Sequence, residues 1–171
     1  MAFISYLKDI SDFALANKDY SLLAILLFIL LIVIIKRLIK AFKNRHYSRI
    51  KRLLGAYRGR PLEFEYFIAG LYEAMGYSAE VTHGSHDGGK DIILSKGKKS
   101  YVVEVKLYEQ ENKISREKIQ KLHSAMIDTD ANGAIFVTTS DFTKEALAYA
   151  DKHNIVTVNG TKLSKLIKNR M

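Results

Sequence analysis

Residues 87–106 read DGGKDIILSKGKKSYVVEVK, in which two strand-like segments flank a glycine and a lysine. DIILSK and SYVVEVK are both rich in β-branched and aromatic residues, which favour strands. Between them, Gly97-Lys98 suits a two-residue hairpin turn with glycine at the first turn position. A turn at this pair places Lys96 opposite Lys99. The stretch therefore predicts an antiparallel hairpin with a defined register.

This register brings three polar side chains onto one face. Counting outward from the turn, Asp91 lies opposite Glu104 with Cβ atoms roughly 5 Å apart, and strand alternation returns Lys106 to the same face. Like charges facing each other destabilise a ladder, so the carboxylate pair is expected to hold a divalent cation. Mg²⁺, or Mn²⁺, is the candidate, because magnesium binds through one or two carboxylates plus waters and substrate phosphate. The alternative is a solvated hairpin, which the apolar VVEV and DIIL disfavour.

The same residues resemble the PD-(D/E)xK nuclease superfamily. The stretch from about Phe64 to Ile167 is similar to its Mrr-like restriction endonuclease catalytic domain. Five ordered segments carry this resemblance, which is far more specific than a lone ExK. They are FEYFIAGLYEAMGY (64–77), HGSHDGGKDII (83–93), EVK (104–106), AIFVTTSDFTKEALAYA (134–150) and VNGTKLSKLI (158–167).

The resemblance implies a role for each matching residue. Asp91 and Glu104 would be metal ligands, Lys106 would orient or deprotonate the attacking water, and Glu65 would be a first-helix acid near the metal. Many Mrr-like domains carry Gln at the position of Glu104, whereas this chain has the form commoner in the wider superfamily. The implied reaction is Mg²⁺-dependent hydrolysis of phosphodiester bonds in DNA.

Two functions from different classes follow. The first is a membrane-anchored, metal-dependent DNA endonuclease, with a role in restriction or defence against foreign DNA. The alternative is a catalytically silent, membrane-tethered module that keeps the nuclease fold to bind nucleic acid or a protein. Retention of Asp91, Glu104 and Lys106 together favours the enzyme.

An apolar run near the N-terminus predicts a membrane anchor. Residues 20–35 read YSLLAILLFILLIVII without a charge, and residues 20–39 are predicted to form a transmembrane helix. A buried core helix is disfavoured because the run has no polar face. A cleaved signal peptide is disfavoured because basic residues follow the run. Residues 1–19 would form a short extracytoplasmic segment, a candidate amphipathic helix.

Charge sets the predicted orientation. Residues 36–60 contain ten basic side chains and no acidic one, whereas residues 61–171 are balanced, with fifteen of each sign. The positive-inside rule therefore predicts a single-pass protein of the cell inner membrane with a cytoplasmic C-terminal domain. Residues 40–60 would form a basic juxtamembrane stem that faces anionic lipid. The predicted partners are DNA, the lipid membrane through residues 20–39, and a second copy in a homodimer.

The remaining pattern predicts the fold class. Residues 61–171 are expected to form an α/β domain with a restriction-endonuclease-like central mixed β-sheet flanked by helices. Helices are predicted at about 62–75, 115–128, 143–153 and from 161, with strands at 133–139 and 155–158. His83 and His86 are interpreted as ordinary loop histidines rather than zinc ligands, because the chain has no cysteine.

Overall fold

The computed structural model describes residue 8, residue 12 and residues 18–82 and 90–169. It divides into two compact units, Met1–Asn44 and Arg45–Met171. Helix α2 (Lys18–Tyr57) contributes residues to both units. The predicted amphipathic helix at the N-terminus lies outside the described residues except for Lys8 and Asp12.

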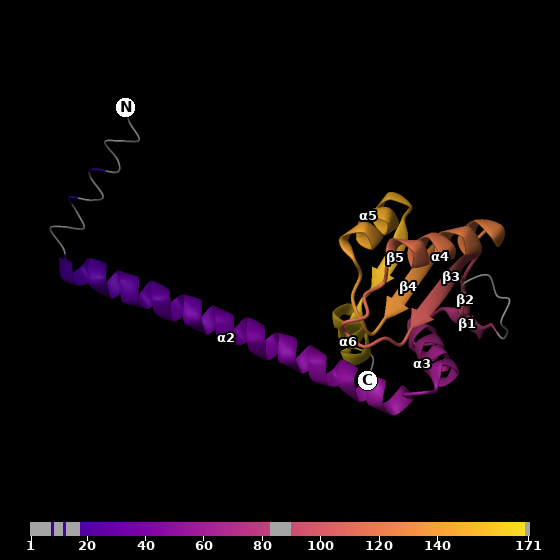
Figure 1. Cartoon of the computed structure of the whole chain (residues 1–171), viewed down its shortest axis with the longest axis horizontal. Helices are drawn as coiled ribbons and strands as arrows, with labels where there is room; N and C mark the ends of the chain where they lie inside the picture. Colours follow the sequence, from indigo (N-terminus) through magenta and orange to yellow (C-terminus); the bar gives the residue numbers. More distant parts are fainter. Residues whose placement is uncertain (1–7, 9–11, 13–17, 83–89, 170–171) are drawn as a thin grey trace. The chain divides into compact units, whose positions relative to one another are not determined.

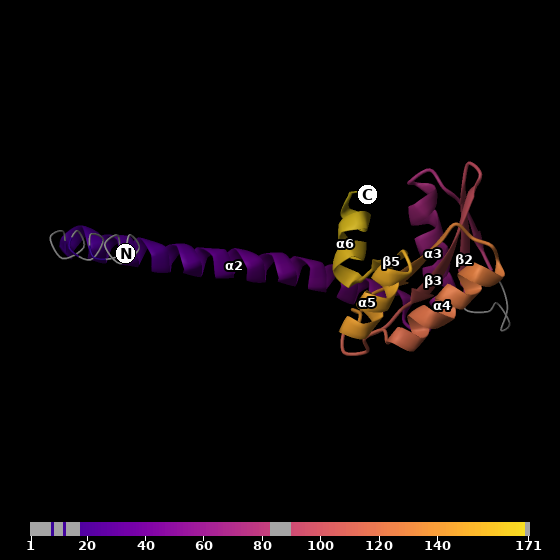
Figure 2. The same ribbon diagram turned by 90° about the horizontal axis from the view of Figure 1, so that it is seen from above.

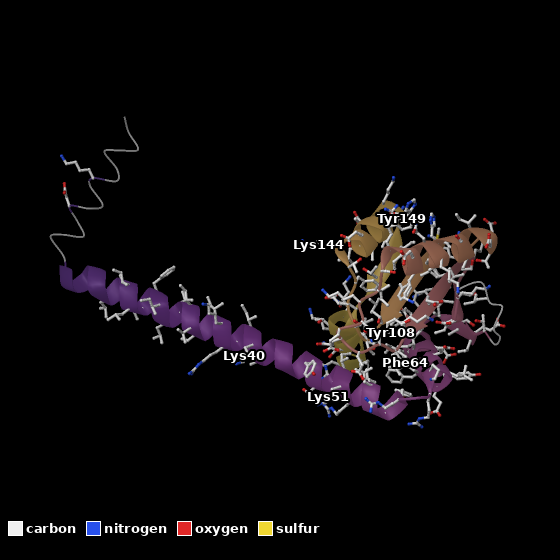
Figure 3. The ribbon with its side chains drawn as sticks, in the orientation of Figure 1. Lys40, Lys51, Phe64, Tyr108, Lys144 and Tyr149 are labelled. Carbon is white, nitrogen blue, oxygen red and sulfur yellow. The ribbon has the colours of Figure 1, made fainter. Side chains whose placement is uncertain are left out.

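In the first unit, α2 presents large apolar side chains to solvent. Those from Leu23 to Ile35, together with Leu38 and Ile39, are between 36% and 64% exposed, and Figure 3 shows side chains standing out from this part of the helix. Within the residues that the structure describes, no helix combines the length and the apolar character needed to cross a membrane. The structure therefore does not support the transmembrane helix predicted for residues 20–39.

The second unit is built on a five-stranded mixed sheet (Figure 1). Its strands are β1 (Ser78–Val81), β2 (Ile92–Lys96), β3 (Lys99–Lys106), β4 (Gly133–Thr138) and β5 (Ile155–Val158). They lie side by side in sequence order. β1, β2 and β3 pair antiparallel, whereas β3, β4 and β5 pair parallel. The sheet confirms the predicted mixed α/β fold class.

The hairpin of β2 and β3 has the predicted register. Lys96 pairs with Lys99, and Ile92 pairs with Val103 at the other end of the ladder. Gly97 has a φ of 62°, a left-handed conformation that glycine adopts without steric cost. Turn chemistry alone was therefore enough to fix which side chains share a face.

Helices cover both faces of the sheet (Figure 2). α4 (Arg116–Asp128) and α5 (Lys144–Lys152) lie on one face, and α3 (Pro61–Glu73) and α6 (Gly160–Lys168) lie on the other. α4 connects β3 to β4 and α5 connects β4 to β5, because parallel strands need a crossover connection.

Each face of the sheet has its own apolar core. On the α3 side, Phe64 and Ile68 pack against alternate residues of β2 and β3, and Figure 3 labels Phe64 within this layer. On the α4 side, Ile119 and Leu122 pack with Phe136. β4 is buried along almost its whole length, as its continuous apolar run predicted.

The last turns of α2 belong to the domain. Ile50 is 2% exposed and forms part of the core on the α3 side. The Arg49 guanidinium donates to the Ser164 carbonyl oxygen at 3.0 Å and to Ser164 Oγ at 2.8 Å. The compact unit begins at Arg45, within the stretch that the sequence analysis assigned to the stem. Arg49 and Ile50 therefore pack within the compact unit.

Candidate active site

Asp91 sits at the mouth of the hairpin, immediately before β2. Its backbone N–H donates to the Val103 carbonyl at 2.7 Å, and its carboxylate Oδ2 accepts the Val105 N–H at 2.6 Å. From the other side, the Thr82 N–H donates to the Asp91 carbonyl at 2.9 Å. Main-chain groups of two neighbouring strands therefore fix both the backbone and the side chain of Asp91.

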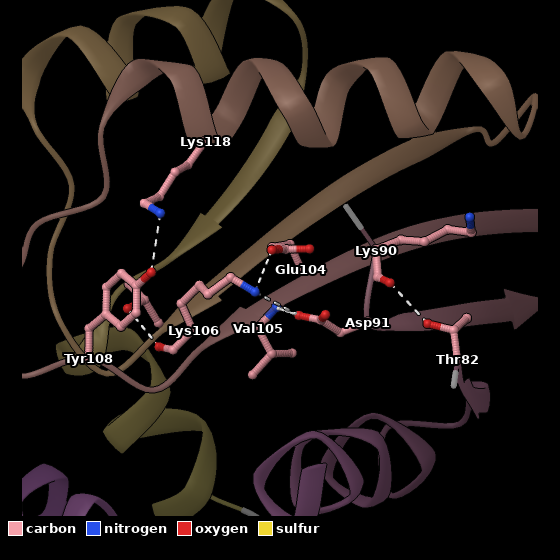
Figure 4. Close-up of polar contacts among 9 residues, drawn as sticks. Thr82, Lys90, Asp91, Glu104, Val105, Lys106, Tyr108 and Lys118 are labelled. Carbon is pink, nitrogen blue, oxygen red and sulfur yellow. Dashed lines mark hydrogen bonds and ion pairs between the residues drawn. The ribbon is translucent and has the colours of Figure 1, made fainter. Parts of the chain in front are cut away.

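The Lys106 ammonium lies between the two predicted carboxylates (Figure 4). Lys106 Nζ is 2.5 Å from Glu104 Oε1 and 3.4 Å from Asp91 Oδ2. The structure thus brings Asp91, Glu104 and Lys106 together on one face, as predicted. It also corrects the expectation that the carboxylate pair needs a cation to offset its repulsion, because Lys106 compensates part of that repulsion.

Burial strengthens the electrostatics of this cluster. The Glu104 side chain is only 9% exposed. Burial, followed by the nearby charge of Asp91, raises the pKa of Glu104, although Lys106 and Lys121 oppose the shift. Burial would by itself lower the pKa of Lys106, but the two carboxylates outweigh it and raise that pKa. The lysine is therefore held in its charged form.

Two threonines at the end of β4 hold the end of β3, a role that no local sequence pattern indicates. Thr138 Oγ1 donates to the Lys106 carbonyl at 2.9 Å. Thr139 Oγ1 donates to the Tyr108 carbonyl at 2.7 Å and accepts the Tyr108 N–H at 2.8 Å. Both threonines are almost completely buried. They fix the backbone on which Lys106 and Tyr108 are carried.

The donor set fits a hard divalent cation. Glu104 Oε2 is buried and has no hydrogen-bond partner among the described residues, so it is an acceptor that a cation would satisfy. Asp91 and Glu104 both supply carboxylate oxygens, which magnesium prefers. Among the described residues, no three His, Asp or Glu side chains gather into a group that could hold a metal. Water and substrate oxygens would have to complete the coordination shell.

Glu65 is half-buried on α3. Ile68, Ala69 and Tyr72 follow it by three, four and seven residues, so all four lie on one side of the helix. These three residues are buried. Glu65 therefore lies on the side of α3 that carries buried residues. Its assignment to the metal site stays a prediction. His83 and His86, the residues considered for zinc, lie outside the described residues.

A carboxylate pair and a lysine on a hairpin of a mixed sheet define the class of restriction-endonuclease-like nuclease domains. The family model described as a restriction endonuclease, Mrr_cat, matches residues 57–167. The chain belongs to this family.

Two relatives share recognisable sequence with the chain. The uncharacterized protein y4cE of Sinorhizobium fredii (strain NBRC 101917 / NGR234) is 32% identical over 108 residues, which cover 54% of this chain and 28% of y4cE. The type IV methyl-directed restriction enzyme EcoKMrr of Escherichia coli (strain K12) is 28% identical over 114 residues, which cover 63% of this chain and 38% of EcoKMrr. The chain thus spans only about a third of the length of these relatives.

Solved structures show the same fold. The DNA modification-dependent restriction endonuclease AspBHI superposes with a TM-score of 0.62 at 18% identity, over 74% of this chain and 35% of AspBHI. The MspJI restriction endonuclease, solved in complex with a 27-mer oligonucleotide, superposes with a TM-score of 0.59 at 18% identity, over 74% of this chain and 31% of MspJI.

Proposed function

We propose that this chain is a metal-dependent DNA endonuclease that acts in restriction of foreign DNA. The observation that carries the proposal is the cluster of Asp91, Glu104 and Lys106, with a buried acceptor oxygen left over on Glu104. Membership of a restriction endonuclease family supports the reaction class, and the name of EcoKMrr, a methyl-directed restriction enzyme, supports a role in restriction.

The residues divide the work of phosphodiester hydrolysis. Asp91 and Glu104 would hold Mg²⁺ or Mn²⁺, which would polarise the phosphoryl oxygen and acidify a water molecule. Lys106, which is ion-paired with both carboxylates, would stabilise the negative charge that develops on the phosphoryl group. The hydrogen bond from Val105 N–H keeps Asp91 directed toward this point. Glu65 is a candidate for orienting the water.

The test is cleavage of supercoiled, linear, methylated and branched DNA by the full-length protein, in mild detergent, with Mg²⁺, Mn²⁺ or EDTA. We expect nicking or cutting only with a divalent ion, and none by Asp91→Asn or Glu104→Gln. Metal-independent cleavage, or equal cleavage by the variants, would contradict the assignment. DNA binding without cleavage by the wild type under any condition would favour the alternative, a catalytically silent binding module.

The location of the chain is a further proposal, which rests on the sequence. We propose a cytoplasmic nuclease domain held at the inner membrane by residues 20–39. The exposed apolar side chains of α2 support it, because so much apolar surface is unfavourable in water. Extraction with alkaline carbonate should leave the protein in the membrane pellet, and protease added to intact cells should spare residues 61–171. A fully soluble protein after extraction would contradict the anchor.

A further inference from the structure

A second group of polar side chains lies beside the catalytic cluster. Lys118 Nζ on α4 lies 3.2 Å from the hydroxyl oxygen of Tyr108 and 5.4 Å above its ring. Figure 4 shows Lys118 reaching down from α4 to Tyr108, next to Lys106. Tyr108 is only two residues beyond Lys106, so this pair stands directly at the end of the catalytic strand.

The Tyr108 side chain is presented by a rigid backbone. Thr139 Oγ1 holds both the N–H and the carbonyl of Tyr108, and the ring packs against the core on the α4 side. Its hydroxyl nevertheless reaches the exposed Lys118 ammonium. Packing alone accounts for the ring but does not require a hydroxyl at this place.

A second exposed lysine lies on the same helix. Lys121 follows Lys118 by three residues, so both lie on one side of α4. Lys118 and Lys121 therefore form a positive border on the side of α4 from which Lys118 reaches Tyr108.

The acidic residues in this region have partners of their own. Glu109, next to Tyr108, pairs with Arg58 at 3.5 Å. Glu117, next to Lys118, accepts a hydrogen bond from Ser115 Oγ at 3.2 Å. Neither is paired with the lysines of α4, so the positive border is available to an anionic ligand.

We propose that Tyr108 and Lys118 form a phosphate clamp that binds the DNA backbone beside the scissile phosphodiester. This inference rests on the proposed function and deepens it by naming residues that seat the substrate. Lys and Tyr side chains commonly contact phosphate oxygens. Two donors that are 3.2 Å apart can meet two oxygens of one phosphate. These contacts fix the register of the strand and carry no base sequence information.

The experiment compares Lys118→Met, Tyr108→Phe and the control Lys98→Met in the full-length protein. Each substitution keeps the apolar part of its side chain. Lys98 is an exposed lysine in the hairpin turn, at the opposite end of the ladder from Asp91. Affinity for a labelled DNA duplex is measured in EDTA over a range of salt concentrations, so that no cleavage occurs. Thermal melting of each variant confirms that it is folded.

We expect Lys118→Met to weaken binding several-fold on every duplex sequence. The slope of log affinity against log salt should become shallower by about 1, since one phosphate contact is lost. Tyr108→Phe should weaken binding without a change of slope, because it removes no charge, and Lys98→Met should match the wild type. With metal present, the first two variants should lower kcat/KM more than kcat.

The experiment distinguishes failure of the phosphate clamp from failure of the nuclease assignment. If the wild type binds and cuts DNA but Lys118→Met and Tyr108→Phe behave like Lys98→Met, the clamp is refuted and the nuclease assignment stands. If the wild type binds and the clamp variants weaken binding, yet no metal supports cleavage, the clamp stands and the nuclease assignment is refuted. If the wild type binds no DNA at all, both are refuted.

Discussion

Lys106 is the internal counter-ion of Glu104, with its ammonium nitrogen 2.5 Å from Glu104 Oε1. The glutamate and the lysine of the ExK motif are therefore ion-paired with each other. One lysine forms ion pairs with both carboxylates, so the three side chains hold one another in place. It also leaves one negative charge of the trio uncompensated, and this charge is available to a divalent cation.

Lys106→Met should be both less stable and inactive. Removing the ammonium leaves two carboxylates facing each other in a largely buried place, at a cost of about 1–3 kcal/mol once partial exposure is considered. The loss of a group that stabilises transition-state charge should lower cleavage by about 100- to 1,000-fold. Chemical denaturation in EDTA and cleavage with Mg²⁺ measure the two effects. An active variant would remove Lys106 from the mechanism.

Divalent ions should raise the melting temperature of the wild type in a way that depends on both carboxylates. A ligand that binds the native state stabilises it by mass action. Differential scanning fluorimetry with increasing Mg²⁺ or Mn²⁺ should therefore show a rising melting temperature. The rise should disappear in Asp91→Asn and in Glu104→Gln, and should persist in Glu73→Gln, which changes an exposed residue at the end of α3. Equal rises in all four proteins would place the ions elsewhere.

Stability in EDTA should depend on pH through Glu104. Burial, reinforced by Asp91, raises the pKa of Glu104 above its ordinary value of 4.5. A raised folded-state pKa means that the contribution to stability is fully present below the unfolded-state pKa and is lost as pH rises through the folded-state pKa. The wild type should therefore lose stability relative to Glu104→Gln as pH increases from 4.5 toward neutrality. Parallel pH profiles of the two proteins would show that Glu104 is not perturbed.

The parts of the fold that sequence could predict are those with strong local signals. The Gly97-Lys98 turn fixed the hairpin register, and periodic apolar residues located α3, α4 and α5 to within two residues at each end. β1 was missed because it has only four residues, and only Val81 among them is buried. Such a strand exists mainly because β2 offers it a partner, which a local pattern does not contain.

In the candidate site too, some features follow from local sequence patterns and others depend on contacts between distant segments. Asp91, Glu104 and Lys106 could be placed on one face from strand alternation and the turn alone. The position of the ammonium between the carboxylates, the threonines that hold β3 and the approach of Lys118 to Tyr108 depend on contacts between distant segments. The packing of Ile50 was also missed, because its run of basic neighbours is typical of a solvated helix.

Ile50→Ala should destabilise the nuclease domain, since the end of α2 is part of its core. Ile50 is 2% exposed, and deleting a buried isoleucine side chain typically costs about 2–5 kcal/mol. Lys51→Ala changes the exposed neighbour on the same helical turn and should have little effect. Urea denaturation of the full-length variants measures the difference. Equal stability of the two variants would show that Ile50 is not part of the core of the nuclease domain.

Gly160→Ala should damage the junction between α6 and the end of β4. A Cβ atom at Gly160 would overlap the backbone carbonyl of Thr139, and that backbone cannot easily move because Gly160 N–H donates to the Ser140 carbonyl at 2.9 Å. Overpacking of this kind costs about 1–3 kcal/mol. Thr139 also holds Tyr108, so DNA affinity should fall with stability. Gly55→Ala is the matched control, because its Cβ would meet nothing within 4 Å on α2. Alanine in place of a helical glycine should there be neutral or add about 0.5–1 kcal/mol. If melting experiments rank the two variants in the opposite order, the close approach of α6 to Thr139 is not a feature of the folded protein.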